Sequence, residues 1–489
     1  MTRAEILDVY NAGPEAVIAL VEHLLATIAQ QQKATAELTA RVQHLENQRA
    51  TTSHNSSKPP ASDGFAKKTK SRREKSGKKP GGQPGHPGRT LCQVPDPHHT
   101  VSHLPQRCPC CETALADVPA TQVEARQVFE IPLSPIEVTE HQVGTKECPR
   151  CGCVARGEFP AWVTQPVQYG PRLSSVLVYL VTYQLIPRKR TQELMQDLFG
   201  ATVGGGTLAT VIARCAHGLA TTSERIREAI RQARCAGFDE TSVRIGGKLH
   251  WWHTAVTPEL TQYHVHGKRG REGIDAGGIL PGFRGRAMHD GWGPYAHYGC
   301  DHGLCNAHHL RELTYLVERE SQEWAAEMID LLTLALEQVE GARAEGAREL
   351  DAVTLDTIRT EYRRIVAAGW EANPLPAEEP REPTEPRRRG RRAQSKARNL
   401  LTRLDRYEEE TLAFTSDFEV PFDNNQAERD LRMMKVEQKI SGGFRSEEGA
   451  HRFGRIRGYL ATMRKQGQPM LAAIESVFCG HPVVPSLSG

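Results

Sequence analysis

The N-terminal part of the chain carries apolar side chains at alternating four- and three-residue steps. The positions in this series are Val17, Val21, Leu24, Ile28, Gln31, Thr35, Leu38, Val42 and Leu45. This spacing is typical of the a and d seam of a coiled coil, so residues 1–50 are predicted to form an oligomerisation helix. Gln31 and Thr35 are polar and would weaken the seam while setting its register and oligomeric state. The alternative is an amphipathic helix that packs on its own domain.

The hydrophobic pattern stops after this helix, and residues 51–98 are rich in Gly, Pro, Ser and Lys. A segment with so few apolar residues cannot offset its ordering entropy, so we expect a disordered basic linker. Residues 58–89 hold ten Lys and Arg against two acids. The basic side chains that we expect to contact phosphates here are Lys67, Lys68, Arg72, Arg73, Lys78 and Lys79.

Positive charge is concentrated in two runs rather than spread over the chain. The whole sequence has 62 Lys and Arg against 59 Asp and Glu, a net charge of +3. Residues 381–398 form the second run, with eight Lys and Arg against two acids. A nearly neutral chain with two basic runs indicates a polyanionic partner, with nucleic acid as the first candidate. The alternative for each run is a solvated linker without a partner.

Two C-x2-C knuckles follow the basic linker. They are formed by Cys108 with Cys111 and by Cys148 with Cys151. Adjacent Pro and Gly residues allow turns in which two thiolates converge, and four thiolates complete a tetrahedral Zn2+ site. We therefore predict a zinc-ribbon-like module with one structural ion over residues 99–160, with strands supplied by the alternating stretch 123–147. Cys110 and Cys153 complicate the choice of ligands, and buried or incidental thiols are the alternative.

Residues 161–234 show helical periodicity. An apolar stripe is formed by Leu173, Val176, Leu177, Leu180 and Val181. Two further short helices, at 193–198 and 207–216, are separated by the letters GATVGGG. Such a pair is compatible with a helix-turn-helix that binds DNA, but the Gly run has no base-reading residues. The alternative is a purely structural helical collar.

From residue 235 the pattern changes to short alternating stretches bounded by Gly. Strands are predicted in 235–247, 248–257, 260–270 and 282–291, with a short helix at 272–279 and a long helix from Cys305. This order of meander, helix, strand and helix is that of an RNase H-like core, a mixed sheet flanked by helices. The segments are then 235–315 for its first part, 316–410 for a helical insertion with the second basic run, 411–445 for its second part and 446–489 for a C-terminal helical tail. The expected fold class is α+β and multidomain.

Three acids lie at positions where such a core would carry its catalytic residues. Asp239 is on the first predicted strand, Asp290 ends the fourth, and Glu428 is in the first turn of a helix after residue 423. The first and fourth strands of this fold are neighbours, so Asp239 and Asp290 are expected to meet, and a helix across the sheet adds Glu428. Carboxylate oxygens suit Mg2+ or Mn2+, and two such ions support phosphodiester chemistry.

Several neighbouring residues compete for these roles. Glu240 follows Asp239 directly, and Asp423 either binds the ion or caps the helix. A further Cys/His group is formed by Cys300, His302, Cys305 and His308. This group is a candidate second zinc site, or it braces the catalytic strand or contacts substrate.

Basic residues follow Glu428 along one helical face. Arg432, Lys435 and Lys439 lie four, seven and eleven positions after it. A metal-binding Glu beside three cations would hold an ion at one end of the helix and grip DNA phosphates along the rest. The alternative is an exposed charged face with ordinary ion pairs between neighbouring turns.

The sequence gives no sign of membrane insertion. Its longest apolar stretch, about 173–186, is interrupted by polar residues and shorter than the roughly 20 residues that span a bilayer. The N-terminus lacks a signal-peptide pattern. We therefore expect a cytoplasmic, nucleoid-associated protein, in which the twelve cysteines serve as metal ligands or buried thiols rather than disulfides.

The motifs together resemble those of bacterial DDE transposases of the insertion-sequence-66 family. The matching pieces, in order, are NSSKPPASDG, KKPGGQPGHPG, the two knuckles, FDET, HDGWGPY, CNAHHLREL, DNNQAERDLR and QKISGGFRSEEGA. The resemblance implies transposition by a two-metal RNase H-like core with Asp239, Asp290 and Glu428 as the triad. It makes Cys305 and His308 candidate active-site neighbours and Lys435 a residue that holds the transposon end. The Gly-rich letters TVGGGT depart from the family pattern and put the local DNA-binding helix in doubt.

The resemblance also implies the partners and the reaction. The protein would bind the terminal inverted repeats of its element as a homo-oligomer, cleave the 3′ ends and join them to double-stranded target DNA. Some relatives are encoded beside small helper proteins. The insertion between Asp290 and Glu428, which are 138 positions apart, fits a helical domain better than a bare core. A catalytically silent DNA-binding repressor of the element is the alternative function, and an RNase H-like repair nuclease is a third.

Overall fold

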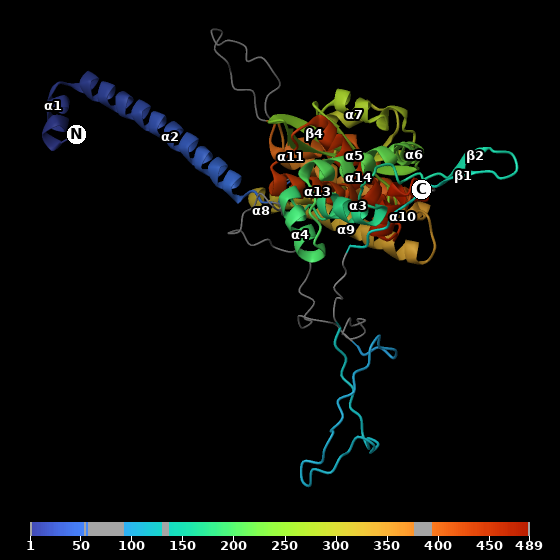
Figure 1. Ribbon diagram of the computed structural model, residues 1–489. Helices are drawn as coiled ribbons and strands as arrows, with labels where there is room; N and C mark the ends of the chain where they lie inside the picture. The colour runs from blue at the N-terminus through green and yellow to red at the C-terminus, as the bar shows by residue number, and fades with distance from the viewer. Residues whose placement is uncertain (1, 53–54, 57–91, 130–135, 376–393, 488–489) are drawn as a thin grey trace. The chain divides into compact units, whose positions relative to one another are not determined.

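The computed structural model describes residues 2–52, 55–56, 92–129, 136–375 and 394–487 (Figure 1). The six linker cations predicted to contact phosphates, and most of the second basic run, lie outside the described residues. The chain divides into two units, each described by itself. The larger contains Met1–Thr69, His141–Glu193 and Val203–Gly489, and the smaller contains Lys70–Glu140 and Leu194–Thr202.

Two helices begin the chain, α1 (Arg3–Asn11) and α2 (Pro14–Ala50). Thr2 and Glu5 form a capping box at the start of α1, because each side chain accepts from the other's backbone N–H. Gly13 separates the helices with a φ of +104°, a conformation that residues with a Cβ rarely adopt. The whole predicted seam, from Val17 to Leu45, lies within the single helix α2.

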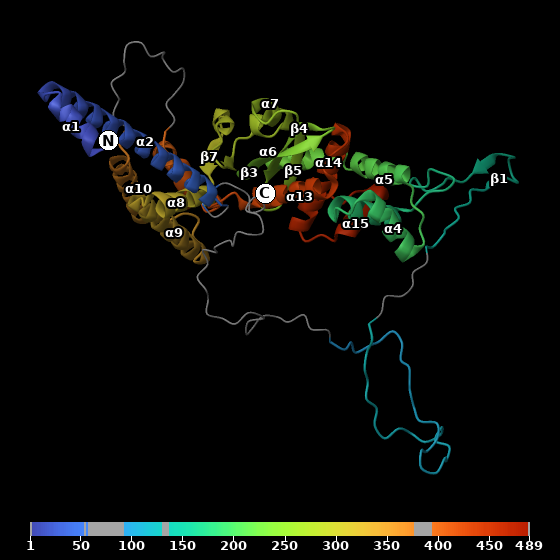
Figure 2. The same ribbon diagram turned by 90° about the vertical axis from the view of Figure 1, so that its left-hand side faces the viewer.

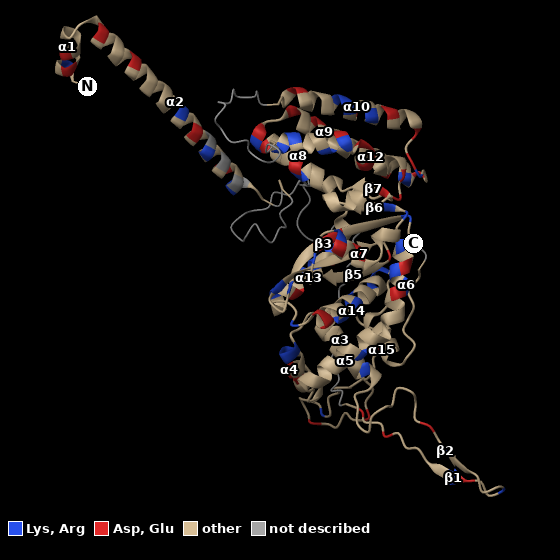
Figure 3. Ribbon diagram, turned by 90° about the horizontal axis from the view of Figure 1, so that it is seen from above, with Lys and Arg blue, Asp and Glu red and all other residues tan. Residues whose placement is uncertain are grey.

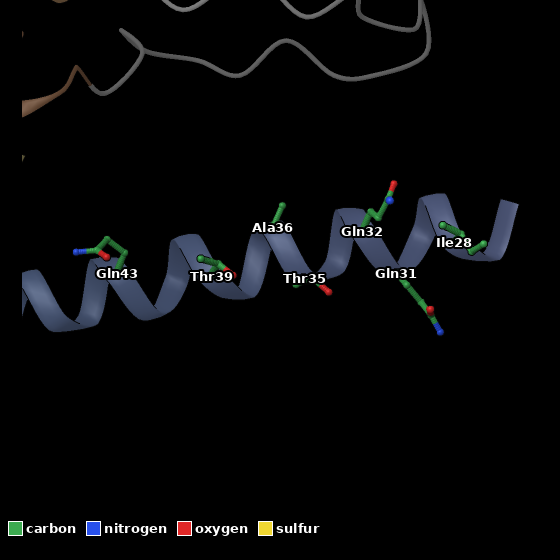
Figure 4. A pocket seen from close by; sticks show the side chains of 7 residues that line it. All are labelled: Ile28, Gln31, Gln32, Thr35, Ala36, Thr39 and Gln43. Atoms are coloured by element: carbon green, nitrogen blue, oxygen red, sulfur yellow. The ribbon is translucent and has the colours of Figure 1, made fainter. Parts of the chain in front are cut away.

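The apolar seam of α2 is exposed in the single chain. Val21, Leu24 and Ile28 are 48%, 45% and 49% exposed, and Leu38, Val42 and Leu45 are at least as open. An open hollow of about 840 Å3 along the middle of α2 is lined by residues of this helix alone, namely Ile28, Gln31, Gln32, Thr35, Ala36, Thr39 and Gln43 (Figure 4). It is a helix surface rather than a cleft. The coiled coil remains a prediction.

The two cysteine knuckles are tight turns. In the first, the backbone N–H of Cys108 donates to Thr113 O at 2.9 Å. The second is flanked by a two-stranded antiparallel hairpin of β1 (Thr145–Glu147) and β2 (Val154–Arg156). Of the stretch 123–147, which was expected to supply strands, only β1 is a strand in the described part. The rest of its described residues have no regular structure.

A helical region precedes the sheet. Its elements are α3 (Pro171–Val178), the π-helical turn η2 (Tyr179–Tyr183), α4 (Arg188–Phe199), α5 (Gly205–Gly218) and α6 (Ala220–Arg231). Two C-terminal helices, α14 (Glu447–Lys465) and α15 (Met470–Phe478), pack against α5, and α15 also packs against α3. Arg457 of α14 donates to the carbonyl of Tyr183 at 2.8 Å. The C-terminal tail is thus built into the same core as this helical region.

A five-stranded mixed sheet lies at the centre of the larger unit. Its strands are β3 (Cys235–Ile245), β4 (Lys248–Val256), β5 (Thr261–His266), β6 (Arg286–His289) and β7 (Asp301–Leu304). The spatial order is β5-β4-β3-β6-β7. The first three strands are antiparallel, while β6 runs parallel to β3 and β7 parallel to β6. The four strands expected from the sequence are present, and β7 is an additional one.

Helices cover both faces of this sheet. On one face, α13 (Asn425–Ser441) packs on β3 and β4 and α14 packs on β5, around the buried side chains of Val243, Trp252, Leu431 and Met434. The short α7 (Arg271–Gly277) contacts β4 and β5 from the opposite side (Figure 2). Two short 3-10 turns, η3 (Leu280–Gly282) and η4 (Gly293–His297), flank β6. The fold is therefore a mixed α/β arrangement.

Five helices between β7 and α13 form a second hydrophobic core. They are α8 (Asn306–Glu320), α9 (Glu323–Ala344), α10 (Ala352–Ala372), α11 (Lys396–Arg406) and α12 (Glu408–Ser416). Their shared core includes Trp324, Tyr362 and Phe414. Figure 3 shows these helices stacked beside the β7 end of the sheet. No helix among the described residues is long and apolar enough to cross a membrane.

Candidate active site

Asp239 lies on the central strand β3, on the face covered by α13. It is paired in register with Thr254 of β4. Its carboxylate accepts a hydrogen bond from the backbone N–H of Glu240 at 2.8 Å. Burial raises the pKa of Asp239 well above its ordinary value, and the negative charges of Glu240, Asp290 and Glu428 raise it further. Asp239 is thus a partly buried carboxyl under the negative charge of three other acids.

Asp290 leaves the neighbouring parallel strand at the same level. Gly237 of β3 pairs with Met288 of β6, and Asp239 and Asp290 each lie two residues further along. The chain then turns at Gly291, whose φ is +86°. The backbone N–H of Trp292 donates to Asp290 Oδ1 at 2.8 Å, which fixes the carboxylate beside the strand end.

Glu428 is brought to this edge by the N-terminus of α13. The N-cap residue Asn424 donates from Nδ2 to the carbonyl of Phe238 at 2.8 Å, one residue before Asp239. A Cβ on Gly237 would lie 2.4 Å from Asn424 Oδ1, so only Gly allows this approach. Because α13 starts against β3, its first turn carries Glu428 to the acids of the sheet.

Two basic groups face the Glu428 carboxylate. Nη2 of Arg311 lies 3.7 Å from Oε2, and Nε2 of His308 lies 3.6 Å from Oε1. Both residues belong to the first turns of α8. Burial lowers the pKa of His308, and the charge of Arg311 lowers it further, whereas Glu428 opposes the shift. The imidazole is therefore biased toward its neutral form.

The competing acids have other partners. Glu240 points to the opposite face of β3, where Nη2 of Arg269 lies 2.6 Å from Oε1 and the Tyr295 hydroxyl donates to Oε2 at 2.6 Å. Burial raises the pKa of Glu240, and both hydrogen bonds oppose that rise. Asp423 precedes the N-cap residue Asn424 and accepts from the backbone N–H of Asn425 at 2.9 Å, which stabilises the turn into α13; it is not itself the N-cap that the sequence suggested as one of its two roles.

The four residues of the Cys/His group do not form one cluster. His302 is hydrogen-bonded through Nδ1 to Nε2 of His289 at 3.0 Å. In the described part of the chain, one group of three or more His, Cys, Asp or Glu residues has ligand atoms within 4.8 Å of one another. It consists of Cys305, His308 and Glu428. The geometry therefore joins Cys305 and His308 to the third acid rather than to Cys300 and His302.

The three cations expected to follow Glu428 along α13 have different surroundings. Arg432 and Lys439 are exposed. Lys435 is half-buried and donates from Nζ to the carbonyl of Ser242 at 2.5 Å and to its Oγ at 3.0 Å. Burial lowers the pKa of Lys435. In this structure Lys435 ties α13 to β3, and its proposed DNA contact would require this bond to be exchanged.

Local hydrogen bonds prepare both knuckles for deprotonation. The pKa of Cys111 is lowered chiefly by the side chain of Thr113, whose Oγ1 lies 3.2 Å from Sγ, and also by Cys108. The pKa of Cys148 is lowered by the backbone N–H groups of Arg150 and Cys151. Low thiol pKa values favour the thiolate form that binds Zn2+. In each knuckle the two thiols of the C-x2-C motif therefore lie close enough to interact, Cys108 with Cys111 and Cys148 with Cys151.

The residues that hold the acids in place were less visible in the sequence. Asn424 is part of the motif DNNQAERDLR, but no local pattern indicates its bond to β3. Arg269 stands over the rings of Trp251 and Trp292, at 5.1 and 4.1 Å from their centroids, and no sequence pattern indicated this role. A Gly two residues before an acid on a central strand was the available signal for the close approach at Gly237.

The site and the fold together define a protein with a cluster of acids at the centre of a mixed sheet, joined to cysteine knuckles suited to zinc. The family model described as the transposase IS66 family matches residues 166–452, which is more than half of the chain, so the chain belongs to this family. Residues 105–152 match the zinc-finger binding domain of transposase IS66, which supports a structural zinc ion. Residues 9–91 match a family of unknown function, DUF6444. No curated protein matches the chain.

Proposed function

We propose that this transposase is a DDE enzyme that cleaves the 3′ ends of its element and joins them to target DNA. The five-stranded sheet would be an RNase H-like core, with Asp239, Asp290 and Glu428 as its metal ligands. The observation that carries the proposal is the convergence of the three acids. Asp239 within β3 and Asp290 just after β6 lie at one level of two adjacent parallel strands, and the negative charges of Asp290 and Glu428 both raise the pKa of Asp239.

The donor set fits a hard divalent cation. The charges of Asp290 and Glu428 act on the Asp239 carboxyl, although ligand atoms of the three acids do not all lie within 4.8 Å of one another. A cation bound among them would draw them together and remove the repulsion that burial makes costly. Oxygen donors of this kind suit Mg2+ or Mn2+. Two such ions, when bound, would activate a water or a 3′-hydroxyl and stabilise the leaving oxygen of a phosphodiester.

The chain's own residues position these ligands. Asn424 fixes the start of α13 on β3, and the Trp292 N–H holds Asp290. Arg311 and His308 stand beside Glu428, at 3.7 and 3.6 Å from its carboxylate oxygens. Glu240 braces the segment after Asp290 through Tyr295, so it would position Asp290 from the other face of the sheet without contacting DNA.

DNA binding would use other parts of the chain. The zinc module, the basic linker, and Arg432 and Lys439 on α13 would contact the terminal inverted repeats and target DNA, with Lys435 joining them if it leaves Ser242. The exposed seam of α2 would pair with that of a second copy, since an uncovered apolar stripe at heptad spacing favours self-association. We place the protein in the bacterial cytoplasm, associated with the nucleoid, with small helper proteins as further partners.

The test is a cleavage assay on DNA that carries the element's own ends. Purified wild-type protein in Mg2+ or Mn2+ is expected to nick the 3′ ends. Glu428→Gln keeps the side-chain shape but removes a ligand charge, and should slow cleavage at least about 100-fold, since metal ions supply several kcal/mol of transition-state stabilisation. Equal cleavage by both proteins would refute the role of Glu428. Tight, specific binding of the ends with no cleavage by wild type in either metal would favour the DNA-binding repressor.

A further inference from the structure

The N-termini of two helices bring a thiol, an imidazole and a carboxylate together. Cys305 immediately precedes α8, His308 lies in its first turn, and Glu428 lies in the first turn of α13. One potential ligand atom from each residue lies within 4.8 Å of the other two. The residues come from positions 123 apart in the sequence, so the fold rather than local spacing creates the group.

Two of the three side chains have a buried polar atom that makes no hydrogen bond. His308 Nδ1 and Glu428 Oε1 are buried and make no hydrogen bond within the described residues. Buried polar atoms are usually satisfied, because leaving one unpaired costs free energy. Glu428 Oε1 faces His308 Nε2 at 3.6 Å, too far for a hydrogen bond, and a cation bound there would satisfy this oxygen. The unsatisfied oxygen therefore points to a ligand of this group.

The backbone around the group is held firmly. The N–H of Asn424 donates to Cys305 Sγ at 3.1 Å, which ties the start of α13 to the residue before α8. The N–H of Asn306 donates to the carbonyl of Phe422 at 3.1 Å. Cys305 is 1% exposed, whereas the His308 and Glu428 side chains are 16% and 27% exposed. The group is thus fixed on rigid elements and opens to solvent on its imidazole and carboxylate side.

The donor atoms select a class of metal. A thiolate, an imidazole and a carboxylate are the ligands that Zn2+ and similar borderline-soft ions use, often with an open fourth position. Mg2+ prefers oxygen donors alone. The charged groups that act on this cluster include Arg311 beside Glu428, Asp290 and Glu312 on His308, and Asp423 on Cys305. The acids offset the unfavourable charge of Arg311.

We propose that Cys305, His308 and Glu428 form a binding site for a zinc-class divalent ion, separate from the cysteine knuckles. Its consequence for catalysis rests on the proposed function. An ion held here would draw Glu428 away from the Mg2+ ligand set, so zinc would inhibit DNA cleavage.

The first experiment counts zinc on the full-length chain. Wild type, Cys305→Ala and His308→Ala are dialysed against buffered Zn2+ and analysed for metal, with Cys479→Ala and His297→Ala as matched controls. Cys479 is a half-buried thiol after α15, and His297 is exposed. Each site variant should hold about one ion less than wild type, because loss of one of three ligands opens the site. The control variants should bind as much zinc as wild type. Site variants that also bind as much zinc as wild type would overturn the proposal.

A second measurement assigns the thiol without depending on the knuckles. Co2+ is added to a full-length variant in which Cys108, Cys111, Cys148 and Cys151 are replaced by Ser. A thiolate-to-cobalt absorption band that disappears when Cys305→Ala is added supports the site, and absence of the band in the first variant refutes it. Thermal melting of each variant checks that the core is folded. His308→Ala removes a partly exposed side chain, so it remains informative if Cys305→Ala unfolds.

A third measurement addresses inhibition. Cleavage of element ends in Mg2+ is titrated with Zn2+, and each protein is normalised to its own rate without zinc. His308→Ala should require roughly tenfold or more zinc for the same inhibition, the scale on which lost metal-site interactions act. Equal sensitivity would overturn the inhibitory role. If no protein cleaves DNA, the proposed function fails, while the zinc count and the cobalt band still decide the metal site.

Discussion

Tyr295→Phe tests whether Glu240 braces the segment that carries Asp290. The substitution removes one hydroxyl, which donates to Glu240 Oε2 at 2.6 Å, and leaves the ring stacked on His289 with 4.7 Å between centroids. Both side chains are 2% exposed. A buried hydrogen bond to a charged group contributes about 1.5–3 kcal/mol, and its loss leaves a carboxylate oxygen unsatisfied. The opening free energy of the β3–β6 region should fall by that amount.

Amide hydrogen exchange is the suitable assay, because a chain with more than one core has no single unfolding free energy. Amides of β3 and β6 should exchange about 10- to 150-fold faster in the variant, since each 1.36 kcal/mol is a factor of ten. Tyr298→Phe is the matched control. Its hydroxyl donates at 2.7 Å to Asp275, which is exposed. The opening free energy should therefore change by no more than about 0.5 kcal/mol in this control.

The effect of Tyr295→Phe should depend on pH with a defined sign. Burial raises the pKa of Glu240, and the Tyr295 hydroxyl opposes this rise, so its removal raises the pKa further. An acid whose folded-state pKa lies above its unfolded value loses stability as pH increases through the folded pKa. The loss of opening free energy in the variant, relative to wild type, should therefore be largest above that pKa and become smaller on acidification. Equal protection in the variant and wild type, or a deficit that grows toward low pH, would refute the reasoning.

Three further changes test other parts of the molecule. Gly237→Ala should destabilise the site by about 1–3 kcal/mol, because its Cβ would lie 2.4 Å from Asn424 Oδ1; unchanged thermal melting would contradict this. Cys148→Ser should release the structural zinc ion and weaken end binding while the sheet stays folded, which metal analysis and circular dichroism would check. Deletion of residues 1–50 should lower the mass measured by light scattering; an unchanged mass would mean that the α2 seam does not hold copies together.

The sequence predicted most of the sheet because its turns and alternation are clear. Strands β3 to β6 are bounded by Gly-rich turns and alternate in hydrophobicity, which period-2 patterns identify well. β7 was missed because its four residues, Asp301–Leu304, include a Gly and do not alternate. Its pairing is created by β6 beside it, which lies outside any local window.

The sequence indicated the acids of the candidate site, but not the residues that hold them in position. Asp239 and Glu240 were both open as ligands, and alternation along β3 places them on opposite faces, with α13 on the side of Asp239. Helical spacing suggested that Lys435 shares a face with Arg432, but its long side chain reaches back to Ser242. Helical spacing determines the face on which a residue's Cα lies, but it does not determine where the terminal group of a long, flexible side chain is placed.

The helical insertion is clamped at its base. Asn306, at the start of α8, bonds to the carbonyls of Phe422 and Thr411 near the end of the insertion, and Asn424 bonds to Cys305. The geometry of the acids is thus set by the two ends of the inserted chain and not by its length. Each doubling of a closed loop costs only about 0.6 kcal/mol, so length changes far from the clamp are thermodynamically cheap. Segments of different length, including an engineered domain, can therefore be accommodated between the two clamped ends with little disturbance to the acids.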